Sequence, residues 1–196
     1  MRLVVGLGNP GPRYKETRHN VGYLVLDELA RRFSVAFRKT RYADEVRVGR
    51  LVLLKPTTMM NASGLAVQAA VTKNRFSLDD VLVIHDDLDL PLGRLRLKAG
   101  GGGAGGARGV EDIARRLGPN FVRLKVGITR PPEGWEARSW VLSRFAQEEA
   151  VLLRRVIEVA ADAVELLSVE SAQAVMSRFN GLDIRDIVAN EHHIVS

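Results

Sequence analysis

The sequence predicts an α/β fold: a single globular domain with a mixed twisted sheet flanked by helices on both faces. Apolar runs of strand length, such as Leu3-Val4-Val5 and Val81-Leu-Val-Ile84, alternate with longer amphipathic segments. The chain has 196 residues, of which 46% are hydrophobic, and this is enough to bury one sizeable core. No internal repeat or charge block divides the sequence, so we expect one domain over residues 1–196.

Six strands and five helices are expected in chain order. Apolar runs and alternating residues predict strands near residues 2–6, 45–48, 51–54, 81–85, 94–98 and 122–127. Apolar residues at helical spacing predict helices near residues 21–33, 64–74, 109–117, 146–167 and 171–179. The fourth helix has an apolar stripe that should pack on the sheet or on a neighbouring helix, formed by Leu152, Val156, Val159, Ala163 and Leu166.

Two segments are expected to be mobile. Residues 130–139 begin with Arg130-Pro-Pro-Glu-Gly134, in which two prolines and a glycine prevent regular structure without supplying apolar anchors. Residues 189–196 should form a flexible tail, and His192 and His193 lie within it. We therefore expect no chemistry from these two histidines.

The composition excludes several kinds of chemistry. The absence of cysteine excludes disulfides, thiolate zinc sites and cysteine nucleophiles, and four histidines leave little material for a metal site. No stretch approaches the roughly twenty apolar residues of a membrane span, and Met1-Arg2-Leu3 leads into a strand rather than a signal peptide. We expect a soluble cytoplasmic protein that works without metal or cofactor, through histidine, carboxylate, amide, hydroxyl and backbone groups.

The positive charge is concentrated in the first quarter of the chain. The net charge is +6, and residues 1–50 hold eleven Lys and Arg against five acids, which already gives +6. A polyanionic partner would explain this, because phosphate neutralisation gathers Lys and Arg near the contact. Arg31 and Arg32 have an equally good alternative as surface pairs, since Asp27 and Glu28 lie four residues before them.

Four loops should meet at strand ends, where open α/β sheets collect their ligands. They span residues 6–20, 55–61, 85–89 and 100–109. The Gly6-Leu-Gly8 turn resembles a dinucleotide-binding motif only weakly, because Pro10 interrupts the helix start, so a nucleotide-binding oxidoreductase is a poor alternative. The glycine-rich loop lacks a P-loop ending; it is either a flexible connector or, as we favour, a substrate-facing loop before a helix.

His19, in Thr17-Arg18-His19-Asn20, is the best candidate for chemistry. A catalytic imidazole needs an acceptor that orients its other nitrogen, and a carboxylate such as Asp86 would also stabilise the imidazolium. Asp86, Asp87 and Asp89 could instead form a magnesium site, which we favour less because no second carboxylate cluster faces them. His85 and Asp86 are neighbours on a strand, so only one of the two can easily point into the site.

Several long motifs along the chain resemble those of bacterial peptidyl-tRNA hydrolases. They are Gly6-Leu-Gly-Asn-Pro-Gly11, Tyr14, Thr17-Arg-His-Asn20, Lys55-Pro-Thr-Thr-Met-Met-Asn-x-Ser-Gly64, His85-Asp-Asp-Leu-Asp-Leu-Pro-Leu-Gly93, Phe121-Val-Arg-Leu-Lys-Val-Gly-Ile128 and Trp140-Val-Leu142. The resemblance covers essentially the whole chain in order. It implies an esterase that cleaves the peptide from the 3′ ribose of tRNA, with peptidyl-tRNA as its partner, no obligate protein partner and a monomeric state.

The resemblance also implies roles for individual residues. His19 is then the general base that activates water, and Asp86 is the carboxylate that orients it. Asn9 and Asn61 match asparagines that position the substrate carbonyl and the peptide main chain. Tyr14 and Met60 match residues that line the same cleft. Hydrolysis of an ester by activated water suits a chain without a cysteine nucleophile, and an amide can donate to the developing oxyanion.

Two alternating segments predict a cationic surface for tRNA. In Arg94-Leu-Arg-Leu-Lys98 and Val122-Arg-Leu-Lys-Val126, basic residues occupy one face and apolar residues the other, so neighbouring strands would form a phosphate clamp. The resemblance assigns Lys98 and Lys125 to the tRNA 5′-phosphate; arginine is familiar at the latter position, and lysine lacks its bidentate fork. Alternatively, such residues at a sheet edge discourage aggregation, and Arg94 fits that role equally well.

The glycine-rich loop departs from the family pattern. The family commonly has His-Gly-Gly-His-Asn-Gly where this chain has Ala104-Gly-Gly-Ala-Arg-Gly109, so two histidines and an asparagine are missing. Arg108 either takes the place of the asparagine as a substrate-binding donor, as we expect, or leaves that role vacant. We expect activity to be retained and the gating of the cleft to be altered. The alternative function is a catalytically silent RNA-binding relative that acts as an adaptor.

Overall fold

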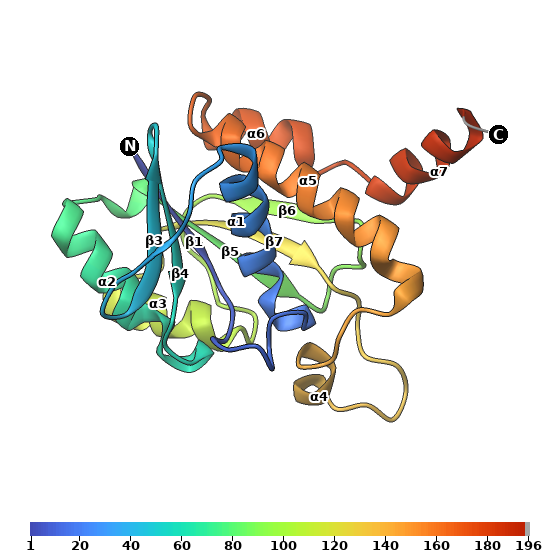
Figure 1. Cartoon of the computed structure of the whole chain (residues 1–196), viewed down its shortest axis with the longest axis horizontal. Helices are drawn as coiled ribbons and strands as arrows, with labels where there is room; N and C mark the ends of the chain where they lie inside the picture. The colour runs from blue at the N-terminus through green and yellow to red at the C-terminus, as the bar shows by residue number, and fades with distance from the viewer. Residues whose placement is uncertain (195–196) are drawn as a thin grey trace.

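A central sheet carries the fold, and the computed structural model describes it within residues 1–194 (Figure 1). In that range seven strands form one mixed sheet in the order β2-β3-β4-β1-β5-β7-β6. The strands are β1 (Arg2–Gly6), β2 (Arg38–Lys39), β3 (Ala43–Val48), β4 (Leu51–Pro56), β5 (Val81–Asp87), β6 (Leu95–Lys98) and β7 (Val122–Gly127).

The four central strands, β4, β1, β5 and β7, are parallel, whereas β3 and β6 pair antiparallel at the two sides. The carboxyl ends of these parallel strands therefore meet at one edge of the sheet, as open α/β sheets require for a ligand site. The loops after β1, β4, β5 and β7 all start at this edge. The predicted mixed sheet is confirmed. Strands β6 and β7 are neighbours, which is the condition on which the phosphate clamp depended.

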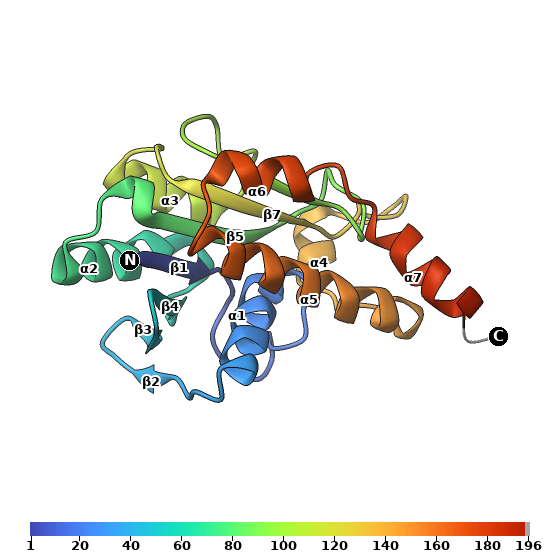
Figure 2. The same cartoon turned by 90° about the horizontal axis from the view of Figure 1, so that it is seen from above.

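Helices cover both faces of the sheet (Figures 1 and 2). They are α1 (Val21–Arg32), α2 (Ser63–Asn74), α3 (Arg108–Leu117), α4 (Ala137–Val141), α5 (Ala150–Leu167), α6 (Ala172–Phe179) and α7 (Ile184–Ile194). Short 3-10 turns add η1 (Arg18–Asn20), η2 (Met60–Ala62), η3 (Leu78–Asp80) and η4 (Gln147–Glu149). None of the helices in residues 1–194 is long and apolar enough to cross a membrane.

The core divides into two layers because successive strand residues point to opposite faces. Val4 packs with α1, α5 and α6 on one face, whereas Leu3 and Val5 pack with α2 and α3 on the other. The apolar stripe predicted on the long helix lies in the first layer: Val156, Val159 and Ala163 are buried, and Leu152 and Leu166 pack against them. The sheet is thus fixed from both sides, and its carboxyl edge becomes a rigid base for a site.

All six predicted strands and all five predicted helices are present within a few residues, but β2, α4 and α7 were not predicted. Strand β2 has only two residues, and α4 has only five, which are too few to show a period. Residues 130–136 of the predicted mobile loop are irregular, and α4 begins at Ala137. Residues 189–194, where a flexible tail was expected, are the second half of α7, while residues 195–196 lie outside the described range.

Candidate active site

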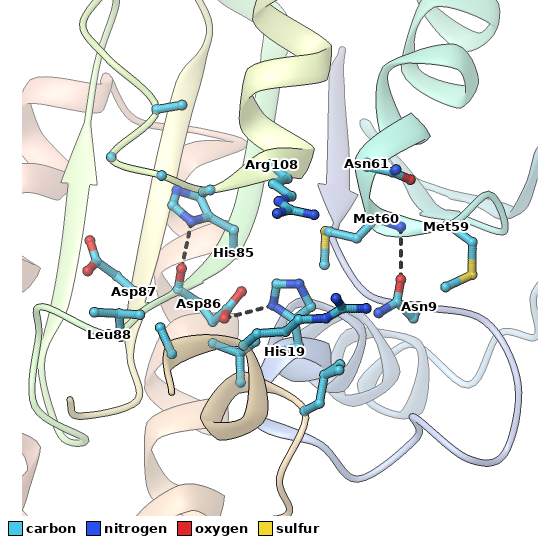
Figure 3. A pocket seen from close by; sticks show the side chains of 18 of the residues that line it. Asn9, His19, Met59, Met60, Asn61, His85, Asp86, Asp87, Leu88 and Arg108 are labelled. Atoms are coloured by element: carbon cyan, nitrogen blue, oxygen red, sulfur yellow. Dashed lines mark hydrogen bonds and ion pairs between the residues drawn. The ribbon is translucent and has the colours of Figure 1, made fainter. Parts of the chain in front are cut away.

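A cleft of about 510 Å³ lies at the carboxyl edge of the sheet (Figure 3). Four connections line it: the loop after β1 with η1, the loop after β4, the end of β5, and α4 after β7. The glycine loop, defined here as residues 100–107, and the first residue of α3 close a further side. Seven of the nine residues predicted for the site line this cleft, namely Asn9, Tyr14, His19, Met60, Asn61, Asp86 and Arg108.

His19 and Asp86 are paired within the cleft. The Nδ1 atom of His19 lies 2.9 Å from Oδ2 of Asp86, although 67 positions separate the two residues in the chain. A carboxylate accepts hydrogen bonds, so this contact places the proton on Nδ1 and leaves Nε2 as an acceptor. Burial disfavours the charged imidazolium, but the charge and the hydrogen bond of Asp86 outweigh it and raise the pKa of His19.

The side chain of Asn9 is held in one orientation by backbone groups. Its Oδ1 accepts a hydrogen bond from the backbone N–H of Met60 at 2.8 Å, which leaves the amide NH₂ as the free donor. Its backbone is fixed by the side chain of Asn20, which accepts from Asn9 N and donates to Asn9 O, both at 2.9 Å. Asn20 is completely buried and was not singled out in the sequence, yet it joins the β1 loop to the turn that carries His19.

Each carboxylate of the acidic cluster at the end of β5 has its own partner. Asp86 binds His19, Asp87 binds Lys125 at 3.0 Å, and Asp89 binds Arg130 at 2.6 Å. The three side chains therefore do not converge on one point, and within residues 1–194 no group of three His, Asp or Glu side chains has the arrangement of a metal site. The arrangement favours the predicted role of Asp86 as a histidine partner over the magnesium alternative.

His85 is buried and lines the cleft together with Asp86, because the cleft lies at the end of β5 and reaches both faces of the strand. Its Nδ1 lies 2.8 Å from the backbone oxygen of Asp86, and burial lowers its pKa, so the ring is neutral. Both neighbours therefore line the cleft: Asp86 contributes its carboxylate, and His85 contributes an uncharged ring to the wall. The strand alternation predicted that only one of them would do so.

The remaining predicted residues occupy the rim and the floor. Met60 is buried, Tyr14 is half-buried and Asn61 is exposed, and all three line the cleft. Arg108, the first residue of α3, is exposed and extends toward the side of the cleft that holds His19 (Figure 3). A donor thus stands where the family pattern has an asparagine.

Lys98 and Lys125 lie on adjacent strands beside the glycine loop. Lys98 is exposed, and its Nζ lies 2.5 Å from the point where a Cβ on Gly102 would stand. Lys125 is opposite Arg96 in the antiparallel register of β6 and β7. The two lysines therefore lie next to the glycine loop but are not among the residues that line the cleft.

Arg123 corrects one part of the predicted phosphate clamp. It is only 1% exposed and donates to the backbone oxygens of Gly103 at 2.8 Å and Gly102 at 3.0 Å. The strand alternation places it correctly on the face of Lys125, but the glycine loop folds over this position and covers it. Periodicity shows the face on which a side chain lies and cannot show that a distant loop covers it.

One wall of the cleft was missed entirely. It consists of Ala137, Arg138, Val141 and Leu142, from α4 and the residue that follows. Figure 1 shows α4 beyond the carboxyl edge of the sheet, near the start of α1. The only available signal was the apolar Trp140-Val-Leu142 run, which was noted as part of the resemblance and was not assigned to the site.

The fold and the cleft define a class of protein: an α/β domain with a histidine–carboxylate pair and an oriented amide at the carboxyl edge of its parallel strands. Residues 3–187 match the family described as peptidyl-tRNA hydrolase. A peptidyl-tRNA hydrolase of Deinococcus deserti is 45% identical over 94% of this chain and 87% of its own length. Another, from Rubrobacter xylanophilus, is 48% identical over 90% of this chain and 98% of its own.

The fold agrees with a solved structure of the same family. The crystal structure of peptidyl-tRNA hydrolase from Acinetobacter baumannii superposes with a TM-score of 0.86 and 32% identity, covering 94% of this chain and 96% of that one. The chain therefore belongs to the peptidyl-tRNA hydrolase family, and the resemblance inferred from its motifs is confirmed.

Proposed function

We propose that this protein hydrolyses the ester bond between the peptide and the 3′ ribose of tRNA in peptidyl-tRNA, releasing free tRNA and peptide. The observation that carries the proposal is the His19–Asp86 pair, whose free Nε2 faces a cleft that also holds the Asn9 amide. Membership of the peptidyl-tRNA hydrolase family supports the same activity.

His19 acts as the general base. Its Nε2 takes a proton from a water molecule while the water oxygen attacks the ester carbonyl carbon. The imidazolium that forms is stabilised by the Asp86 carboxylate, which supports this role because the same contact raises the pKa of His19. The bond from the carbonyl carbon to the 3′ oxygen then breaks, and the 3′ oxygen receives the proton from Nε2. The products are a peptide carboxylic acid and a free 3′ hydroxyl.

Asn9 stabilises the negative charge that develops on the carbonyl oxygen. Its amide NH₂ is available because its Oδ1 is committed to the Met60 N–H. A donor that is oriented before the reaction needs no reorganisation in the transition state, which is the source of its catalytic effect. Asp86, His19 and Asn9 are thus the proposed catalytic residues.

The other site residues bind the two halves of the substrate. Tyr14, Met60 and Asn61 hold the peptide, with Asn61 donating to its main chain, and Arg108 donates to the substrate from the start of α3. Lys98 and Lys125 bind the tRNA 5′-phosphate beside the glycine loop. Lys125 shares its charge with Asp87 at 3.0 Å, so we propose that Lys98 makes the stronger phosphate contact.

We further propose that the protein acts in the cytoplasm as a monomer, without an obligate protein partner and without a metal. Light scattering coupled to size exclusion, at the concentration of the activity assay, should give the mass of one chain. Turnover that persists at full rate after dialysis against a chelator would support the metal-free mechanism, and loss of turnover that zinc or magnesium restores would contradict it.

The activity is tested with an N-acetylated aminoacyl-tRNA as substrate, comparing the wild type with His19→Ala. Loss of the general base should lower the rate by a factor of roughly 10² to 10⁴. His193→Ala is the matched control, because this histidine lies on α7, outside the cleft.

The adaptor alternative predicts a different result. A silent RNA-binding relative would bind the acylated tRNA without releasing its amino acid, and His19→Ala would then behave like the wild type. The geometry supports the hydrolase over the adaptor, because His19, Asp86 and Asn9 are all present and oriented in the cleft.

The proposed role of Arg108 is tested by Arg108→Ala. If this variant leaves both turnover and substrate affinity unchanged, Arg108 does not belong to the proposed site.

A further inference from the structure

Arg18, the residue before His19, is a charged side chain buried in the protein interior. It is only 2% exposed, and it lies at the start of η1. Its guanidinium binds the Glu149 carboxylate with two parallel hydrogen bonds of 3.0 and 2.7 Å. It also stacks on two aromatic rings, with Cζ 3.8 Å from the ring centre of Trp140 and 4.8 Å from that of Phe145.

These contacts all belong to one excursion of the chain, residues 128–149, which we call the α4 segment. The Arg18 guanidinium reaches the beginning of the segment at Ile128 O, its middle at Trp140 and Ser143 Oγ, and its end at Glu149. The Arg18 backbone N–H donates to Ser143 O at 2.9 Å in addition. One residue of the turn that carries His19 therefore contacts the beginning, the middle and the end of the segment.

The α4 segment forms the cleft wall made of Ala137, Arg138, Val141 and Leu142. Other contacts hold the two ends of the segment: Ile128 N and Thr129 N donate to Asp87 O and Leu90 O, Arg130 pairs with Asp89, and Arg144 pairs with Glu16. In α4 between these ends, Trp140 Nε1 donates to Thr129 O at 2.7 Å, which is a contact within the segment itself. Trp135 lies against Trp140 but is half exposed. Between the anchored ends, Arg18 links Trp140 of α4, and Ser143 after it, to the turn that carries His19.

Stability alone does not require a guanidinium at this position. A buried ion pair pays a large desolvation cost, and apolar residues of similar volume often stabilise a fold equally well or better. A guanidinium differs in geometry: its planar fork fixes the carboxylate in one plane, and the same plane stacks on the indole. The chemistry at this position is suited to fixing an orientation.

We propose that Arg18 is a positioning residue that sets the location of the α4 wall relative to His19, and so determines how tightly the cleft holds the ester end of the substrate. Arg18 acts through Glu149 and Trp140 and does not touch the reacting atoms. This inference rests on the proposed hydrolase activity for its kinetic consequence.

The chain supplies its own probe for this position. Its two tryptophans, Trp135 and Trp140, both lie in the α4 segment, so the tryptophan emission of the unlabelled protein reports on this segment alone. Two variants weaken the contact differently. Arg18→Lys keeps the charge but removes the fork and the stacking, and Glu149→Gln keeps the size but removes the negative charge. Arg144→Gln is the matched control, because Arg144 belongs to the same segment but forms an exposed ion pair with Glu16.

The experiment measures kcat, KM and tryptophan emission for these three variants and the wild type, with the N-acetylated aminoacyl-tRNA. A shifted wall should raise KM roughly tenfold in Arg18→Lys and in Glu149→Gln, with a smaller change in kcat. Emission of both variants should shift toward that of exposed indole. A merely structural role would instead lower the active fraction, which reduces apparent kcat and leaves KM unchanged.

Unchanged KM and unchanged emission in Glu149→Gln would overturn the proposal, even if Arg18→Lys failed to fold. The effects on KM should also be less than additive in the double variant, because both substitutions break one contact. Absence of turnover in the wild type would contradict the hydrolase activity, and the emission of the ligand-free variants would then decide the position of the wall by itself.

Discussion

At the scale of single residues, the cleft assigns different states to its two histidines. His19 lies beside a carboxylate that raises its pKa, whereas His85 is buried with only a backbone oxygen on Nδ1 and has a lowered pKa. A raised pKa makes His19 the stronger base, and a lowered one keeps His85 uncharged at neutral pH. One strand end thus provides a reactive imidazole and an inert one.

Asp86→Asn should change the pH dependence of the reaction in a definite direction. The base must be neutral at Nε2, so kcat/KM of the wild type rises with pH through the raised pKa of His19. Without the carboxylate, burial still disfavours the imidazolium, so the pKa falls and the rise should move to lower pH. The plateau should drop roughly a hundredfold because the imidazolium loses its partner. The measurement is a pH profile of kcat/KM.

Asp89→Asn is the control for this substitution, since Asp89 lies in the turn just after β5 and pairs with Arg130 outside the cleft. Its profile should coincide with that of the wild type. A profile of Asp86→Asn that moves to higher pH, or does not move, would mean that Asp86 does not set the pKa of His19.

Sequence reasoning found the residues whose chemistry is distinctive and missed those that support them. His19 and Asp86 could be predicted because strand ends converge in an α/β sheet and because their motifs resemble a family. The contacts of Asn20 and Arg18 could not, because they depend on which backbone and which distant helix lie next to them. A buried arginine looks the same in a sequence as an exposed one.

At the scale of elements, the glycine loop is held in place by a buried residue of β7, Arg123. Arg123 donates to the backbone oxygens of Gly102, Gly103 and Pro119, and no side chain of the loop itself anchors it in the same way. The carbonyls of Gly102 and Gly103 are the anchor points, so the loop's position depends on β7. This loop borders both the cleft and the two proposed phosphate ligands.

Arg123→Met should release the loop without unfolding the protein. Methionine fills a similar buried volume, so the change in the free energy of unfolding should be small, about 1 kcal/mol or less, as for other buried charges replaced by apolar groups. The loop amides should exchange with solvent faster, because their carbonyl anchors are lost. Hydrogen exchange by mass spectrometry would measure this. Arg96→Met, an exposed residue on the adjacent strand, should leave the exchange unchanged, and equal exchange in both variants would refute the anchoring role.

The position of helix α1 against the sheet depends on two glycines, Gly6 in β1 and Gly22 in α1 itself. A Cβ on Gly22 would lie 2.5 Å from Leu7 N and 2.6 Å from Ile84 O, and a Cβ on Gly6 would lie 2.4 Å from Gly22 O. The weak dinucleotide-like motif therefore has a packing explanation: Gly6 lets α1 approach β1. The helix start that carries η1 and His19 is held close to the sheet as a result.

Gly22→Ala should be strongly destabilising. The clashing atoms are backbone of β1's loop and of β5, which cannot move aside as a flexible side chain can, so we expect a loss of about 3 kcal/mol or more. Chemical denaturation at neutral pH would measure it. Gly181→Ala is the control, because a Cβ there meets no atom within 4 Å, and it should stay within about 0.5 kcal/mol of the wild type. A loss below about 1 kcal/mol for Gly22→Ala would contradict the close approach.

The helices and strands that could not be predicted from the sequence are short or have few buried apolar residues. Elements with several periods were placed within a few residues, whereas β2 and α4 have too few residues to show any period. Helix α7 shows a different limit: among those of its residues whose side chains the structure describes, only Ile184 at its start is fully buried. A helix with so little core contact has a weak apolar pattern. Short or weakly packed elements depend on tertiary contacts that no local pattern contains.

At the scale of the whole molecule, the excess of positive charge in residues 1–50 is partly used internally. Arg18 pairs with Glu149 in the interior, Arg31 pairs with Glu28, and Arg32 pairs with Glu28, Asp162 and Glu165. Arg31 and Arg32 thus form surface pairs, as the alternative expected, but Arg31 pairs with Glu28 and not with Asp27, which pairs with Lys55. Arg108 and Arg138 line the cleft, whereas Lys98 on β6 and Lys125 on β7 lie beside the glycine loop. The proposed tRNA contact should depend on these two lysines.

Removal of either lysine should make substrate binding less sensitive to salt. Each phosphate contact releases counterions, so Lys98→Ala should raise KM for the N-acetylated aminoacyl-tRNA and reduce the slope of log KM against log salt by about 1. Lys125→Ala should do less, because Lys125 already pairs with Asp87. Lys73→Ala, on α2 and paired with Glu45, is a control of equal charge change and should keep the wild-type slope.

The 5′-phosphate can be removed from the tRNA, and with this substrate the wild type and Lys98→Ala should become equal in KM and in slope. A difference that persists without the 5′-phosphate would assign Lys98 to another phosphate of the acceptor stem, and no difference with the intact tRNA would show that the exposed lysine on β6 serves only to protect the sheet edge.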